Sequence, residues 1–194
     1  ELLREFAKLT GAPVTSTLMG LGAFPASDPK WLGMLGMHGS FEANNAMHDC
    51  DVMVAIGARF DDRVTGRLDA FAPMSKKIHI DIDPSSINKN VPVEIPIVAD
   101  AGRAIAALLA AWDADSTEVD RPAIAAWWKS IDEWRAVQCL RFRQSMDKGA
   151  IIKPQYAVQR LYEITRELKA TSGRETFIST EVGQHQMWAA QYFG

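Results

Sequence analysis

The sequence predicts an α/β protein built on a doubly wound parallel sheet, and two observations support this prediction. Short apolar runs rich in β-branched residues recur along the chain and end in turn residues. The run at residues 52–56 does not alternate polar with apolar residues, which is typical of a strand covered on both faces. The segments between these runs can form helices, and such alternation of strand and helix is the pattern of parallel sheets.

Strands and crossover helices are expected in alternation along the first part of the chain. The strands are expected at residues 13–16, 32–35, 52–56, 77–82 and 95–98. A helical segment opens the chain at residues 1–9, and crossover helices are expected at residues 41–50 and 100–112. Apolar residues recur at helical spacing in the last of these and predict one buried face. These elements define a central domain over residues 1–112.

A linker and helical connection is expected next, over residues 113–150. Residues 113–121 are polar and acidic and precede Pro122, so they are interpreted as the linker. The following helix carries a stripe of large apolar side chains on one face, namely Ile124, Trp127, Trp128, Ile131 and Trp134. Such a stripe can form a ligand platform, but packing against a core is the favoured interpretation.

A second α/β domain is expected to begin over residues 151–194. Pro154 fits the first turn of a helix, where the missing N–H of proline removes no hydrogen bond. Residues 176–179 are interpreted as a strand, and residues 181–184 as the loop after it. The chain opens without Met and stops within an amphipathic segment, so we expect a piece of a longer protein.

The composition favours small-molecule ligands. The net charge of −3 provides no basic field of the kind that draws proteins onto nucleic acid or anionic membranes. An intracellular location is expected, because no apolar run approaches the ~20 residues that span a bilayer and no signal peptide is evident. Cys50 and Cys139 lack CxxC spacing, so we expect buried free thiols rather than a disulfide framework or a zinc site.

Four loops that follow the expected strands contain residues suited to a dinucleotide. Glycines let the backbone approach a pyrophosphate, arginines offset its charge, and a carboxylate after a strand accepts ribose hydroxyl protons. Loops after parallel strands converge at one edge of the sheet, which makes the set more informative than any single loop. The loops are residues 17–20, 36–39, 57–63 and 81–83.

Each loop also has a simpler interpretation. Gly57 is typical of a turn at a strand end, and Asp61 with Arg63 is typical of a surface ion pair of little energy. Asp81 and Asp83 can equally cap the short helix that begins at Pro84, so only one of them needs to contact a ligand. The four loops together still favour a binding site.

An NAD-binding fingerprint and a metal site are not predicted. Residues 20–25 contain the first two glycines of GxGxxG, but Pro25 stands where the third glycine belongs. The histidines His38, His48 and His79 show no metal-ligand spacing. A hydride-transferring Rossmann enzyme is therefore the weaker interpretation.

Five strings resemble the catalytic large subunit of the acetohydroxyacid synthase (acetolactate synthase) family of thiamine-diphosphate enzymes. They occur in the family's order, and the third and fifth are long and specific. The strings are TLMGLGAFP at residues 17–25, LGMHG at 35–39, GARFDDRVTG at 57–66, HIDIDP at 79–84 and VGQHQMWAAQ at 182–191. The resemblance implies that the first domain is an FAD-binding central domain and that the second binds thiamine diphosphate.

The resemblance also implies cofactor-binding residues. Those of the first domain, chiefly for FAD, are Thr17, Leu18, Met19, Leu35, Gly36, Met37, His38, Gly39, Gly57, Ala58, Arg59, Asp61, Arg63, Val64, Asp81, Ile82, Asp83 and Asp100. Those near thiamine diphosphate, mainly its diphosphate end, are Val182, Gly183, Gln184 and His185, while Gln186 and Met187 are placed towards the flavin. The chain departs from the family at Ser86, where Glu is more common, and at Ala99, where Gly is more common.

An activity follows from the same resemblance. The family condenses two pyruvates, or pyruvate with 2-oxobutyrate, to acetohydroxyacids in branched-chain amino-acid biosynthesis. Thiamine diphosphate held with Mg²⁺ performs the chemistry, and FAD is needed without being turned over in the net reaction. The glutamate that activates the cofactor lies in an N-terminal domain and the magnesium motif lies beyond Gly194. No catalytic residue and no metal ligand are therefore expected here, and the chain alone is expected to be inactive.

The implied assembly is a homodimer or homotetramer of the full-length subunit with a small regulatory subunit. The location would be cytoplasmic in a bacterium and organellar in a eukaryote. Two rival interpretations stay open: a related flavin-containing carboligase or oxidase, such as glyoxylate carboligase or pyruvate oxidase, and a nucleotide-binding module without catalysis. GARFDDRVTG and HQMWAAQ favour the acetohydroxyacid synthase family over the first rival.

Overall fold

The computed structural model describes residues 1–115 and 118–193, which form two compact units. The first unit is Glu1–Val137 and the second is Gln138–Gly194. Ser116 and Thr117, which belong to the expected linker, and Gly194 lie outside the described residues. None of the helices in these described ranges is long and apolar enough to cross a membrane.

The first unit contains the five predicted strands, and every strand pair among the described residues is parallel. The strands are β1 (Val14–Ser16), β2 (Trp31–Met34), β3 (Val52–Ile56), β4 (Lys76–Asp81) and β5 (Ile95–Val98). They form two hydrogen-bonded ladders, β1-β2 and β3-β4-β5. The α/β prediction is confirmed, with the difference that backbone pairing does not run continuously across all five strands.

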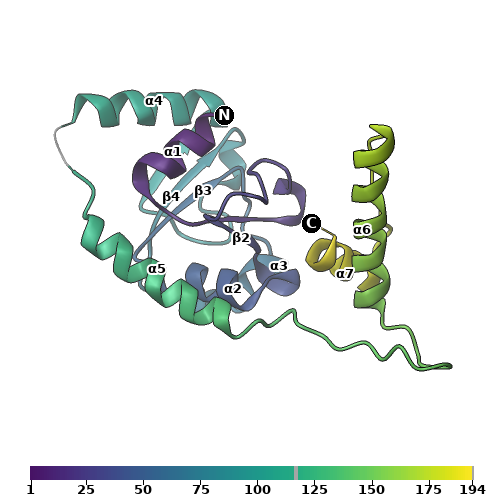
Figure 1. Cartoon of the computed structure of the whole chain (residues 1–194). Helices are drawn as coiled ribbons and strands as arrows, with labels where there is room; N and C mark the ends of the chain where they lie inside the picture. The colour runs from purple at the N-terminus through teal and green to yellow at the C-terminus, as the bar shows by residue number, and fades with distance from the viewer. Residues whose placement is uncertain (116–117, 194) are drawn as a thin grey trace. The chain divides into compact units, whose positions relative to one another are not determined.

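Helices flank the strands of the first unit (Figure 1). They are α1 (Leu2–Thr10), α2 (Phe41–Asp49), α3 (Asp62–Thr65), α4 (Ala101–Ala114) and α5 (Arg121–Ala136). Helices α1 and α4 lie beside each other, α4 contacts β4, and α2 contacts both β2 and α5. Side-chain caps fix several starts: the Ser40 hydroxyl accepts from Ala43 N–H at 3.2 Å, and Asp120 accepts from Ala123 N–H at 3.0 Å.

The tryptophan stripe of α5 packs into a core, as predicted. Ile131 is completely buried with Leu32, Ala43 and Ala46, and Trp127, Trp128 and Trp134 pack against this cluster. The Trp128 indole N–H donates to the carbonyl of Gly11 at 2.8 Å. Helix α5 therefore belongs to the first compact unit, although its residues fall within the expected connection over residues 113–150.

A second core cluster lies beside β3 and β4. It consists of Ala55, Phe60, Phe71, Ala72 and Val91. The rings of Phe60 and Phe71 meet edge to face with centroids 5.8 Å apart. Since Phe60 belongs to the loop after β3, this cluster anchors one of the predicted ligand loops to the sheet.

The second unit contains two helices that pack together, α6 (Pro154–Ser172) and α7 (Gln184–Tyr192). The rings of Tyr162 and Phe193 lie 5.3 Å apart, and those of Phe142 and Tyr192 lie 5.6 Å apart. Pro154 begins α6 as predicted.

Two expectations about the second unit are wrong. Residues 176–179 form no strand and are exposed, because none of the described strands pairs with them and a lone strand leaves its backbone groups and its apolar face uncovered. Phe177 in this segment is 91% exposed. Cys139 is exposed instead of buried, since it lies in irregular chain after α5, whereas Cys50 is partly buried.

Candidate functional site

The predicted ligand loops follow the carboxyl ends of the strands, as the sequence indicated. Short 3₁₀ helices form two of them: η1 (Leu18–Gly20) after β1 and η2 (Gly36–His38) after β2. The loop after β4 leads into a further short 3₁₀ helix, η4 (Pro84–Ser86). The loop after β3 leads into α3, and a further 3₁₀ helix, η3 (Leu68–Ala70), follows it. Open parallel sheets bind ligands at this edge, where loops and helix N-termini present polar groups.

The loop after β2 is held by a side chain that the sequence analysis did not single out. Gly36 donates its N–H to the Asn44 amide oxygen at 2.6 Å, and the Asn44 amide nitrogen donates to the Gly36 carbonyl at 3.0 Å. Gly36 has a positive φ of 81°, which favours glycine. The sequence feature that could have revealed this contact is an Asn one turn into the helix that follows a Gly-rich loop.

The loops after β2 and β3 are in direct contact. A Cβ atom on Gly36 would overlap the carbonyl oxygen of Arg63 and would lie 3.0 Å from Cα of Val64. Only glycine allows this approach, so Gly36 is required by the neighbouring loop as well as by its own backbone angle. The structure therefore brings together the LGMHG and GARFDDRVTG strings.

Arg59 and Asp61 form an ion pair at the start of α3. The Arg59 guanidinium lies 3.0 Å from Asp61 Oδ2, with side-chain exposures of 77% and 32%. Asp61 also caps α3, because its other oxygen accepts from the Arg63 N–H at 3.2 Å. Asp61 therefore pairs with Arg59 and not with Arg63, the partner considered from the sequence. The Arg63 guanidinium lies 3.9 Å from the Asp62 carboxylate.

Phe60 adopts a left-handed backbone conformation between Arg59 and Asp61. Its φ is 52° and its side chain is buried. The Asn90 amide nitrogen donates to the Phe60 carbonyl at 3.0 Å and to the Arg59 carbonyl at 3.3 Å. Asn90 therefore stabilises an uncommon conformation that leaves the Arg59 side chain exposed. No sequence pattern singled out Asn90, because its contact spans about thirty residues.

The two aspartates after β4 are engaged with the loop itself. Asp81 is buried and accepts from the Asp83 N–H at 2.8 Å. Asp83 caps η4 by accepting from the N–H and the hydroxyl of Ser85, and these bonds lower the pKa of the Asp83 carboxyl. Asp83 is therefore the aspartate that caps the short helix beginning at Pro84, which was one of the two interpretations considered from the sequence. Ile82, at the tip of the loop, is 72% exposed.

The remaining predicted residues of the first unit lie in or beside the same loops, except Asp100, which lies between β5 and α4. Thr17 caps η1 by accepting from the Gly20 N–H at 3.2 Å, and Asp100 caps α4 by accepting from the Arg103 N–H at 3.0 Å. Met19 is 93% exposed and Met37 52% exposed. The other predicted residues are partly buried, or exposed in the case of Gly57, and lie in these loops or, for Val64, in α3: Leu18, Leu35, His38, Gly39, Gly57, Ala58 and Val64.

These loops carry groups of the kinds that suit a flavin dinucleotide. Two exposed guanidinium groups, Arg59 and Arg63, suit a pyrophosphate. Exposed apolar side chains, Met19 and Met37, suit a flavin ring. Gly57 has a φ of 65° with open space where a Cβ would lie, so its backbone can be approached closely. The donor set fits the cofactor that the resemblance implied.

The predicted cofactor-binding residues of the second unit, at positions 182–187, lie at the start of α7. Gly183 is the residue before the helix, and Gln184, His185, Gln186 and Met187 form its first turn. Val182 is 78% exposed. A Cβ on Gly183 would lie 2.9 Å from the His185 ring, so a larger residue would displace that ring. A loop followed by a helix is confirmed here, without the strand that was expected before it.

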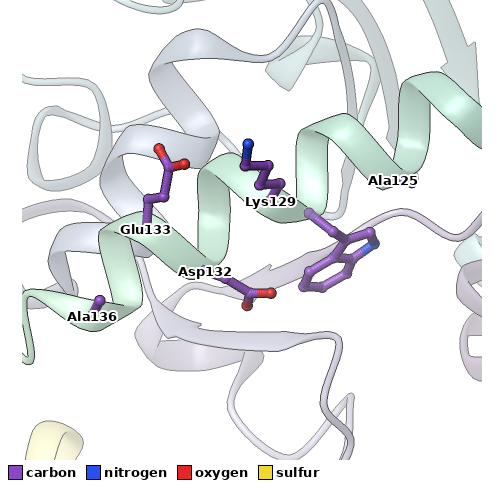
Figure 2. A pocket seen from close by; sticks show the side chains of 6 residues that line it. Ala125, Lys129, Asp132, Glu133 and Ala136 are labelled. Carbon is purple, nitrogen blue, oxygen red and sulfur yellow. The ribbon is translucent and has the colours of Figure 1, made fainter.

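A surface hollow occurs away from the predicted loops. Figure 2 shows that it is formed along α5, and its lining consists of Ala125, Trp128, Lys129, Asp132, Glu133 and Ala136. It contains none of the predicted ligand residues and is lined mainly by one helix, which gives few convergent polar groups. We assign no ligand to it. Across residues 1–115 and 118–193, no group of His, Cys, Asp and Glu side chains is arranged to hold a metal ion.

The parallel strands with flanking helices define an α/β domain of the doubly wound class, in which ligands bind after the carboxyl ends of the strands. Residues 1–108 match the family model described as "Thiamine pyrophosphate enzyme, central domain". The chain belongs to this family.

The chain is also similar to large subunits of acetolactate synthase. It is 44% identical over 193 residues to the "Acetolactate synthase large subunit" of Haemophilus influenzae, which covers 100% of the chain and 32% of that protein. It is 43% identical to the "Acetolactate synthase isozyme 3 large subunit" of Escherichia coli K12, over 98% of the chain and 32% of that protein. The "Acetolactate synthase 1, chloroplastic" of rice is 46% identical over 98% of the chain and 28% of its own length. The chain thus spans about a third of the length of these relatives.

Proposed function

We propose that this chain is the central part of an acetolactate synthase large subunit. The observation that carries the proposal is the 43–46% identity to proteins of that name along almost the whole chain, including both the loops of the first unit and the start of α7. The parent protein condenses two pyruvates, or pyruvate with 2-oxobutyrate, to acetohydroxyacids. Thiamine diphosphate supplies the carbon–carbon bond-forming chemistry when it is bound.

The first unit is proposed to bind FAD through its strand-end loops. The exposed guanidinium groups of Arg59 and Arg63 would face the pyrophosphate, and the apolar tips at Met19 and Met37 would lie against flavin. The start of α7 would contribute backbone N–H groups to the diphosphate of thiamine diphosphate. Mg²⁺ would be held by residues outside this chain.

The chain alone is proposed to be inactive, because resemblance places the activating glutamate and the magnesium motif elsewhere in the longer protein. The full-length subunit would act as a homodimer or homotetramer with a small regulatory subunit. Its location would be the cytoplasm of a bacterium or an organelle of a eukaryote. Pyruvate and 2-oxobutyrate are the proposed substrates.

Product analysis of the full-length protein tests the proposed activity. The protein would be incubated with thiamine diphosphate, Mg²⁺ and FAD, in one reaction with pyruvate and in another with glyoxylate. Acetolactate from pyruvate is the expected product. Tartronate semialdehyde from glyoxylate would instead favour the glyoxylate carboligase alternative, oxygen-dependent formation of acetyl phosphate or acetate would favour an oxidase, and no product would favour a non-catalytic nucleotide-binding module.

A further inference from the structure

A histidine without a hydrogen-bond partner is buried beneath the predicted ligand loops. His79 lies in β4 and its side chain is completely buried. Neither ring nitrogen has a hydrogen-bond partner among the described residues. A buried polar group without a partner is energetically unfavourable, so such an arrangement is retained only where a small rearrangement or a role offsets that cost.

The Asp81 carboxylate at the end of the same strand is a candidate partner. Alternate residues of a strand share a face, and His79 Nε2 lies 3.8 Å from Asp81 Oδ2. The other Asp81 oxygen already accepts from the Asp83 N–H at 2.8 Å. A shift of under about 1 Å would bring the ring N–H within ordinary hydrogen-bond distance of the carboxylate. His79, Asp81 and Asp83 would then form one connected series from the core to the loop tip.

His79 also touches the loop after β3. Its ring meets the ring of Phe60 edge to face, with centroids 5.0 Å apart and an interplanar angle of 72°. Phe60 is the residue with positive φ that separates Arg59 from Asp61. One buried side chain thus contacts two loops that carry predicted ligand residues. The Lys77 ammonium on the same strand face is occupied elsewhere, because it donates to the carbonyls of Ala72 and Ser75.

We propose that His79 is a positioning residue for the ligand loops. Its Nε2–H donates to the Asp81 carboxylate and thereby fixes the turn that Asp81 holds through the Asp83 N–H. Its ring supports Phe60 and hence the backbone that presents Arg59. The effect on FAD binding rests on the proposed function, whereas the hydrogen bond to Asp81 does not.

Nuclear magnetic resonance of the histidine rings tests the hydrogen bond directly. In the ¹⁵N-labelled chain, His79 should be the Nε2–H tautomer, with a ring proton that exchanges slowly with water. His48 is the internal control, since it lies 4.0 Å from Asp49 but is 53% exposed, and its ring proton should exchange rapidly. Asp81→Asn should move the His79 ring signals and leave those of His48 unchanged. A His79 ring in the Nδ1–H form, or one insensitive to Asp81→Asn, would overturn the proposal.

Two substitutions in the full-length protein separate the contribution of the ring N–H donor to FAD affinity from the contribution of ring packing against Phe60. His79→Gln retains an N–H donor near the Nε2 position, whereas His79→Phe retains a ring against Phe60 without a donor. FAD affinity should fall about tenfold in His79→Phe and remain within about threefold of wild type in His79→Gln. Thermal unfolding of each variant would identify losses that merely follow global destabilisation.

The outcomes distinguish the two proposals. Equal affinity losses in both variants, or no loss in either, would contradict a positioning role for the ring N–H. A wild-type protein that fails to bind FAD would remove the flavin assignment, and the ring-proton measurement would still decide whether His79 holds Asp81.

Discussion

At the scale of single residues, Arg59 is the side chain on which the flavin assignment depends most. Replacing Arg59 with Ala in the full-length protein should weaken FAD binding by about 1.5–3 kcal/mol, the range for a charge-assisted hydrogen bond to a phosphate. Arg67 offers a matched control, because it forms the same type of exposed ion pair, with Asp69 two residues further on, at 2.7 Å.

Flavin titration of the two variants measures the dissociation constant of FAD for each. Arg67→Ala should leave the dissociation constant close to that of wild type, since Arg67 lies outside the predicted loops. If Arg59→Ala behaves like Arg67→Ala, the pair between Arg59 and Asp61 is only a surface ion pair, whose net energy is small.

The two thiols should differ in reactivity because their surroundings differ. Burial raises the pKa of the Cys50 thiol, so less of the reactive thiolate is present at neutral pH. Cys139 is exposed. A thiol reagent should therefore label Cys139 of the native chain first, with Cys50 labelled at a comparable rate only after denaturation. Mass spectrometry of the labelled peptides would show the order, and faster labelling of Cys50 would contradict it.

At the scale of elements, the clamp between Asn44 and Gly36 ties α2 to the loop after β2. Asn44→Ala leaves the N–H and the carbonyl of Gly36 without these partners and should lower the free energy of unfolding by about 1–2 kcal/mol. Asn45→Ala in the same helix is the control, since it carries the same change in helix propensity. Urea unfolding of both variants measures the difference, and equal stabilities would show that the clamp contributes nothing.

A separate prediction concerns the start of α7 and the binding of thiamine diphosphate. In the full-length protein, Gly183→Val should lower the affinity for thiamine diphosphate, because the added side chain displaces the His185 ring and crowds the N-terminus of the helix. Flavin affinity should stay nearly unchanged. Parallel titrations of both cofactors give the comparison, and equal losses would indicate that the junction has misfolded instead.

At the scale of the whole chain, the first unit should fold without the second. It contains both core clusters and all the strands of the described residues, within the usual size range of a domain. Residues 174–183 should exchange their amide protons rapidly, since they are exposed and lack regular structure. Hydrogen exchange on the purified chain would show protection in the first unit and none in this segment.

The same chain should form no acetolactate from pyruvate when it is supplied with FAD, thiamine diphosphate and Mg²⁺. The physical reason is the expected absence of the activating glutamate and of the magnesium ligands. The full-length protein in the same assay is the positive control. Measurable product from the chain alone would overturn the proposal that catalysis needs the rest of the parent protein.

The sequence by itself determined the parallel α/β class, the order of the strands and of the longer helices of the first unit, and the loops at the strand ends. These features follow from local pattern: apolar runs rich in β-branched residues mark strands, helical periodicity marks the crossovers, and glycines with charged residues mark the loops between them. Burial was overestimated, because Ala55 is the one buried residue of β3 and Val52 is exposed. The same kind of pattern failed at residues 176–179, because an apolar run becomes a strand only where another strand pairs with it.

Only the tertiary structure decided how those loops are held. Asn44, Asn90 and His79 each act through contacts with other elements or with buried groups that local spacing does not reveal. The packing of α5 onto α2 likewise placed the tryptophan stripe inside the first unit. Hydrogen bonds and ring contacts between distant segments depend on where the chain returns in space, which a one-dimensional pattern does not encode.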